Sequence, residues 1–195
     1  MQSASLRLTH SASSLQLSLT GKVLLSIAAT GLVAICAHVS LPLPFTLVPL
    51  TLQTFAVILI GMFLGPVAGF LSLILYLAEG ASGLPVFSPN GPGGVAQLLG
   101  PTAGYLFSYP LAAALTGLAV RALQNVRSRF TVAIIAGTVA MVPIFTIGAG
   151  WLAHLLHLGI LSSWHLAVAP FLFGEAIKVT AAASIFSTLQ RWRQS

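Results

Sequence analysis

Long apolar segments that exclude almost every charged residue are the feature that most constrains how this chain can fold. Only 5% of its 195 residues are charged, whereas a soluble domain carries about 25%. A helix of roughly 20 apolar residues crosses the hydrocarbon core of a bilayer, and the longer segments here reach that length. The sequence therefore predicts an all-α membrane protein.

Six apolar segments are separated by stretches rich in Gly, Pro or polar residues. They cover residues 23–39, 49–63, 66–78, 102–120, 130–156 and 166–189. The second and third are shorter than a full crossing, so we expect their ends to lie within protein or in a water-filled cavity. We predict a cytoplasmic tail over residues 1–21, with a short surface helix around residues 15–19. A six-helix membrane domain is predicted over residues 22–195.

The distribution of basic residues predicts the orientation, because cytoplasmic connectors carry an excess of Lys and Arg. The three connectors expected to face outward, residues 41–48, 80–100 and 157–165, contain neither Lys nor Arg. With six crossings, seven of the eight basic residues face the cytoplasm: Arg7, Lys22, Arg121, Arg127, Arg129, Arg191 and Arg193. We therefore expect a multi-pass protein of the cell membrane, embedded in the lipid bilayer, with both termini cytoplasmic.

The exception is Lys178, which follows Glu175 by three residues and so shares its helix face. A charged residue at the centre of a membrane helix costs about 2.5–3.5 kcal/mol on insertion scales and normally faces the bundle interior. Two interpretations are open. The pair is either a structural ion pair, or a ligand site in which Lys178 binds a carboxylate and Glu175 accepts hydrogen bonds from ligand N–H groups.

Further polar and aromatic side chains are expected at the same depth as this pair. Ligand pockets are mostly apolar with a few placed polar groups, and this set fits that description. Taken singly, Thr51 and Gln53 are also typical helix-start residues, Asn90 a typical turn residue, and Tyr105 a typical interface anchor. The predicted ligand-binding residues are Asn90, Glu175, Lys178, Gln53, Thr51, Phe87, Gly93, Gly94 and Tyr105.

Several other functions are disfavoured. The net charge of +6 does not indicate nucleic acid as a partner, because such binding needs a basic face on a soluble fold. Cys36 is the only cysteine, and His154 and His157 lack a nearby carboxylate or thiol, so we predict no metal site. No phosphate-binding loop with its lysine occurs. We expect no cofactor, no catalytic residue and no enzymatic activity.

Three stretches resemble the BioY family, the biotin-binding S components of energy-coupling factor (ECF) transporters. They read VPLTLQTFAVILIGMFLGPVAGFLSLILYL, GLPVFSPNGPGGVAQLLGPTAGYL and PFLFGEAIKVTAAA. The resemblance covers about residues 41–183. It implies a six-helix substrate-binding subunit that captures biotin from the outer face. It also implies a transmembrane coupling subunit and two cytoplasmic ATPases as partners, although some members function without them.

The resemblance also implies roles for individual residues. Asn90 and Glu175 correspond to groups that hold the ureido ring, and Lys178 is a candidate partner of the valerate carboxylate. The family often has Pro-Gly-Asp where this chain has Phe173-Gly174-Glu175, which changes the reach of the acceptor by one methylene.

In the first segment, small residues recur at Ser26, Thr30 and Ala34. Such a stripe serves either docking of the coupling subunit or packing within the bundle. Rival functions are an S component for thiamin, which Lys178 disfavours because thiamin is cationic, an intramembrane enzyme, and a scaffold subunit without a ligand.

Overall fold

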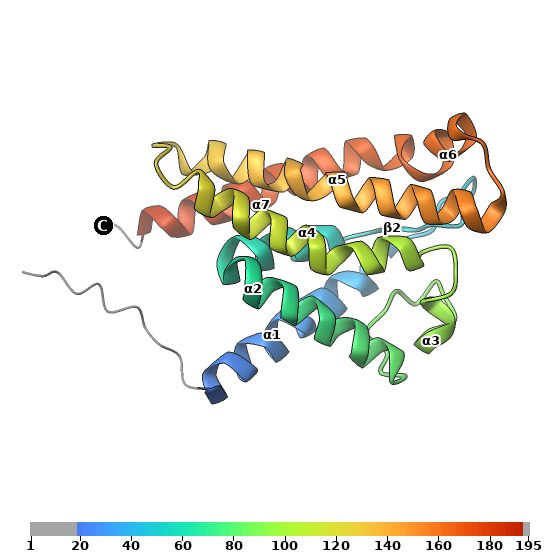
Figure 1. Cartoon of the computed structure of the whole chain (residues 1–195), viewed down its shortest axis with the longest axis horizontal. Coiled ribbons are helices and arrows are strands. Elements are labelled where there is room, and N and C mark those ends of the chain that lie inside the picture. Colours follow the sequence, from blue (N-terminus) through green and yellow to red (C-terminus); the bar gives the residue numbers. More distant parts are fainter. Residues whose placement is uncertain (1–18, 193–195) are drawn as a thin grey trace, which may run out of the picture.

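A computed structural model describes residues 19–192, which form an almost entirely helical protein (Figure 1). Among these residues, three single helices and the stretch Ile160–Trp192 are long and apolar enough to cross a membrane, and a shorter apolar helix covers Val23–His38. The elements are α1 (Leu19–His38), β1 (Ser40–Leu41), β2 (Leu50–Thr51), α2 (Gln53–Ala81), α3 (Gly94–Gln97), α4 (Ala103–Ala122), α5 (Arg129–Leu156), α6 (Ile160–Ala167), η1 (Ala169–Phe171) and α7 (Leu172–Trp192). The prediction of a helical membrane protein is confirmed.

Helix α2 reverses direction at Gly65, whose φ of 79° and ψ of −178° lie outside the helical region. A positive φ is readily adopted by glycine. Gln53 Nε2 donates a hydrogen bond to Tyr76 Oη at 2.7 Å, although a straight helix would separate these residues by about 34 Å. Helix α2 is therefore a hairpin with a first arm (residues 53–64) and a second arm (residues 66–81), which match the second and third predicted segments.

Small residues allow the helices to approach closely around this hairpin. Helix α2 packs against α4, α4 against α5, and α5 against α7. A Cβ atom added at Gly117 of α4 would collide with the backbone of Gly65 and Pro66. Such close backbone approach at small residues is typical of helix packing in membranes. It fixes the tip of the hairpin against α4.

Helix α1 lies at the edge of the bundle and packs mainly against α2. Thr30 is buried and donates a hydrogen bond to Glu79 Oε1 of the second arm at 3.1 Å. Ala34 is half-buried and packs against the core. The predicted small-residue stripe at these positions thus serves packing within the bundle, which was one of its two interpretations.

The connecting segments gather at the two ends of the molecule (Figure 1). One end, here called the loop end, contains the antiparallel β1–β2 pair, α3 and α6. The other, the Gly65 end, contains the reversal of α2, the α4–α5 connection and the end of α7. The tail predicted for residues 1–21 and its short helix lie almost wholly outside the described residues.

Two sequence predictions were wrong in detail. The connector predicted over residues 80–100 is not wholly irregular, because one helical turn, α3, forms there. The connector at 157–165 and the start of the last segment at 166 are replaced by α6 and η1, so the last long helix begins only at Leu172. The reason is Pro170, which has no N–H to donate and cannot continue α6, so that a new helix has to start after it.

Candidate functional site

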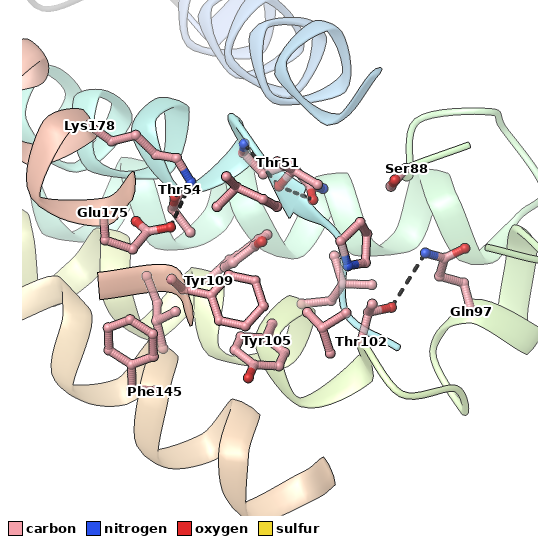
Figure 2. A pocket seen from close by; sticks show the side chains of 17 residues that line it. Thr51, Thr54, Ser88, Gln97, Thr102, Tyr105, Tyr109, Phe145, Glu175 and Lys178 are labelled. Atoms are coloured by element: carbon pink, nitrogen blue, oxygen red, sulfur yellow. Dashed lines mark hydrogen bonds and ion pairs between the residues drawn. The ribbon is translucent and has the colours of Figure 1, made fainter. Parts of the chain in front are cut away.

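A cavity lies among β2, the first arm of α2, α4, α5 and α7 (Figure 2). Five of the nine predicted ligand-binding residues line it: Thr51, Gln53, Tyr105, Glu175 and Lys178. The fold therefore brings these five residues together around one cavity.

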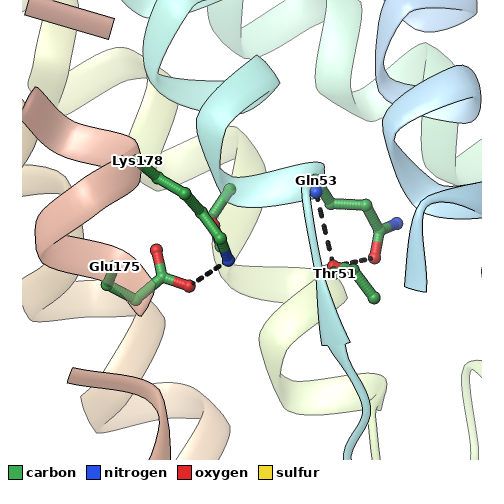
Figure 3. A network of polar contacts seen from close by, with 5 residues as sticks. Thr51, Gln53, Glu175 and Lys178 are labelled. Atoms are coloured by element: carbon green, nitrogen blue, oxygen red, sulfur yellow. Dashed lines mark hydrogen bonds and ion pairs between the residues drawn. The ribbon is translucent and has the colours of Figure 1, made fainter. Parts of the chain in front are cut away.

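Glu175 and Lys178 form a buried ion pair on one face of α7 (Figure 3). Lys178 Nζ lies 2.6 Å from Glu175 Oε1 and donates a second hydrogen bond to Thr54 Oγ1 at 3.1 Å. The other carboxylate oxygen, Glu175 Oε2, is buried and has no partner among the described residues. An unsatisfied buried acceptor costs about 1–3 kcal/mol. A ligand N–H group bound to Oε2 would remove that cost.

Two tyrosines of α4 border the middle of the cavity. Tyr105 contributes its ring, while its hydroxyl donates to the carbonyl oxygen of Ala167 at 2.6 Å. Tyr109 is buried and lines the same space. The sequence analysis missed Tyr109. Its position four residues after Tyr105 places both on one helix face and could have revealed it.

Gln53 connects the cavity rim to the rest of the fold and has no unpaired side-chain atom. Its Oε1 accepts from Thr51 Oγ1 at 3.1 Å (Figure 3). Its Nε2 donates to Tyr76 Oη. Tyr76 Oη in turn donates to the carbonyl oxygen of Val86 at 2.8 Å. This chain of hydrogen bonds joins β2, both arms of α2 and the segment before α3. Gln53 therefore positions the rim.

Gln97 organises the loop end of the cavity. Its Oε1 accepts from the Gly93 N–H at 3.1 Å, and its Nε2 donates to Thr102 Oγ1 at 3.4 Å. Gly93 and Gly94 do not line the cavity. Their φ values of 70° and 58° lie in the left-handed region, and their conformation starts α3. The sequence analysis missed Thr102, because a threonine before a helix is also a common cap.

Asn90 and Phe87 lie beside the cavity, outside its lining. Asn90 is exposed, and its Nδ2 donates to Ser40 Oγ of β1. Ser40 Oγ also lies 3.1 Å from the Oγ of Ser88, which does line the cavity. Phe87 is buried and packs edge-on against Tyr76, with ring centroids 5.4 Å apart. The Ser40 contacts thus tie the two connecting segments together at the loop end.

The residues considered as metal ligands do not form a cluster. Within residues 19–192, no group of three His, Cys, Asp or Glu side chains is placed to hold a metal ion. His154 and His157 are exposed at the end of α5. Glu175 and Lys178 on α7 are therefore the charged side chains available to a ligand in the cavity.

Known proteins have sequences similar to that of this chain. The sequence profile of the BioY family matches residues 7–195. The probable biotin transporter BioY of Pyrococcus horikoshii is 39% identical over 143 residues, which cover 73% of this chain and 81% of that protein. The biotin transporter BioY of Thermotoga maritima is 35% identical over 162 residues, which cover 83% and 91%.

A solved structure has the same fold. It is the crystal structure of the S-component for biotin from an ECF-type ABC transporter. Its TM-score with this chain is 0.79 at 27% sequence identity, and the match covers 88% of this chain and 92% of that one. The helical arrangement around the cavity is therefore shared with a protein that binds a known small molecule.

Proposed function

The chain belongs to the BioY family, and on that basis we propose that it is the biotin-binding S component of an ECF-type transporter. The family consists of membrane transporter components and is not enzymatic. The observation that carries the proposal is the unpaired, buried Oε2 atom of Glu175, which lines the cavity. It provides an acceptor for one N–H group of the ureido ring.

The contacts of Lys178 support an orientation for biotin. An ammonium group has three donors, and two of them are used on Glu175 and Thr54. The third can reach the ureido oxygen, while Glu175 Oε2 accepts from the ureido nitrogen. The ureido head then lies at α7, next to Tyr109. This role for Lys178 differs from the carboxylate partner expected from its residue type, because Glu175 already neutralises its charge.

The remaining predicted residues fit around the head in this proposal. The apolar ring of biotin packs between Tyr105, Tyr109 and Phe171, which line the middle of the cavity. Asn90 reaches the ligand only after its amide leaves Ser40. Thr51 and Gln53 shape the rim, while Phe87, Gly93 and Gly94 support the loop that bears Asn90.

We propose six membrane crossings with both termini in the cytoplasm. The crossings are α1, the two arms of α2, α4, α5 and α7. The reversal of α2 at Gly65 supports this number, since each arm then counts once. The absence of Lys and Arg from residues 41–48, 80–100 and 157–165 supports an outward-facing loop end. The cavity then receives biotin from outside.

The proposed partners are a transmembrane coupling subunit and two cytoplasmic ATPases. The free face of α1 suits the coupling subunit, because a Cβ atom at Gly31 would meet nothing within 4 Å. Leu24, Ile27 and Ile35 around it are 51–69% exposed. Close helix approach at a small residue is a common mode of association in membranes. We expect Gly31→Leu to reduce copurification with the partners and to leave biotin binding unchanged.

A matched control is Gly150→Leu on α5, where a Cβ atom also meets open space. This change should affect neither assembly nor binding. Equal loss of assembly in both variants would contradict docking on α1.

The function itself is tested by calorimetric titration of the purified protein with biotin and with thiamin. Saturable binding of biotin alone is the expected result. Binding of thiamin alone favours the rival S component, and binding of neither ligand favours a scaffold. Turnover of an added substrate would indicate an enzyme.

A further inference from the structure

The two ends of the cavity differ in charge. Glu175 and Lys178 are its only charged lining residues, and their 2.6 Å ion pair is neutral as a whole. The opposite end is lined by Ser88, Gln97, Thr102 and other uncharged groups. Figure 2 shows these three residues on the far side of Tyr105 from the ion pair. A ligand that spans the cavity therefore meets an ion pair at one end and only neutral groups at the other.

Thr102 is the clearest donor at the neutral end. Its Oγ1 accepts a hydrogen bond from Gln97 Nε2, which leaves its own proton free. The proton of Thr51, in contrast, is used on Gln53 Oε1. Gln97 is 3% exposed and is held in turn by the Gly93 N–H. The hydroxyl of Thr102 is thus fixed in place as a neutral donor.

Exposure also differs along the cavity. Thr102 at the neutral end is half-buried, whereas Glu175, Lys178 and Tyr109 are buried. A group attached to the end of a ligand tail beside Thr102 would lie away from the ion pair.

These observations rest on the proposed function and define its substrate class more closely. We infer that the cavity recognises the ring system of biotin and does not require the negative charge of its tail. A carboxylate oxygen and an amide carbonyl oxygen can both accept a hydrogen bond from Thr102. The bond to the ionised carboxylate is the stronger one, because a hydrogen bond with one ionised partner is roughly twice as strong as a neutral bond. Among the described residues that line the cavity, no cation lies at this end to add an ion pair that only the carboxylate could form. Amide conjugates of biotin are thus a second class of ligand for this protein.

The test compares biotin with biotinamide, its primary amide, by competition binding on the full chain in detergent. The expected dissociation constants agree within about tenfold, which corresponds to about 1.4 kcal/mol. A loss of more than tenfold for the amide overturns the inference. If biotin itself fails to bind, the proposed function fails, and the inference falls with it. Biotin binding with rejection of the amide removes the inference alone.

Two variants locate the tail. Thr102→Val should weaken biotin and biotinamide by the same factor, and Thr102→Ser should restore both. Thr138→Val, an exposed site on α5 whose hydroxyl bonds only within its own helix, is the control and should change neither.

Lys178→Met should also weaken both ligands equally, so that the ratio of their dissociation constants stays that of the parent protein. If the parent protein prefers biotin and this variant abolishes the preference, Lys178 holds the tail carboxylate and the inference is wrong.

Discussion

Lys178 Nζ lies 2.6 Å from one oxygen of Glu175, while the other oxygen of the same carboxylate is buried without a partner. The two oxygens therefore have different roles in the proposal. Oε1 compensates the lysine charge and holds α7 together locally, and Oε2 is available to a ligand. Substitutions at these two residues should separate the contribution of the pair to stability from its contribution to binding.

Glu175→Gln should lower the affinity for biotin by about 100-fold, because it replaces a charged acceptor whose hydrogen bond is worth about 1.5–3 kcal/mol. Calorimetric titration measures this loss. The matched control is Glu79→Gln, which changes the only other acid. Glu79 bonds to Thr30 on α1 and does not line the cavity, so its variant should bind biotin normally. A similar loss in both variants would show that the effect is one of net charge.

Lys178→Met and Glu175→Met should each destabilise the protein by leaving one buried charge unpaired, at a cost of about 3–5 kcal/mol. The double variant removes both charges and should unfold at a higher temperature than either single variant. It should still fail to bind biotin. Thermal unfolding in detergent gives the order of stabilities, and additive destabilisation in the double variant would argue against a mutually compensating pair.

Gly148→Ala should disturb the cavity through Tyr105. A Cβ atom at Gly148 would overlap the Tyr105 ring, whose hydroxyl is bonded to Ala167. Movement of this ring should lower both thermal stability and biotin affinity. Gly150→Ala lies two residues further along α5, where a Cβ atom meets open space, and should behave like the parent protein. Normal binding by Gly148→Ala would mean that the ring position is unimportant.

Asn90 is predicted to exchange its bond to Ser40 for a bond to biotin. Asn90→Ala should then weaken biotin binding, whereas Ser40→Ala should leave the affinity equal or higher, because the amide is released in advance. Stopped-flow measurements should also show faster association for Ser40→Ala. If both variants weaken binding to the same extent, Asn90 acts by tying the loop to β1 and does not contact the ligand.

The sequence predicts most of the fold because the relevant signals are local. Apolar length marks the long helices, and Gly65-Pro66 marks the reversal of α2, since glycine adopts the required positive φ. Helix α6 was missed because its eight residues are too few to cross a bilayer. Its place in the fold depends on packing against α5, which no local pattern records.

The residues of the candidate site differ in how clearly the sequence marks them. Glu175 and Lys178 stand out because a charge in an apolar segment is costly. Tyr109 carries no such cost, and only its spacing of four residues from Tyr105 places it on the same helix face. The sequence predicts Gln53 as a ligand-binding residue, and the structure adds its hydrogen bond to Tyr76, which only the reversal of α2 brings near. Partners that meet through tertiary structure are not visible in one sequence.

The hairpin of α2 has a mechanical consequence. Its tip at Gly65 rests on Gly117, and its open end is closed by the bond from Gln53 to Tyr76 beside the cavity rim. The first arm is about 18 Å long at 1.5 Å per residue. Because the hairpin is held at both ends, its arms act as a strut that sets the position of the cavity rim relative to the Gly65 end of the molecule.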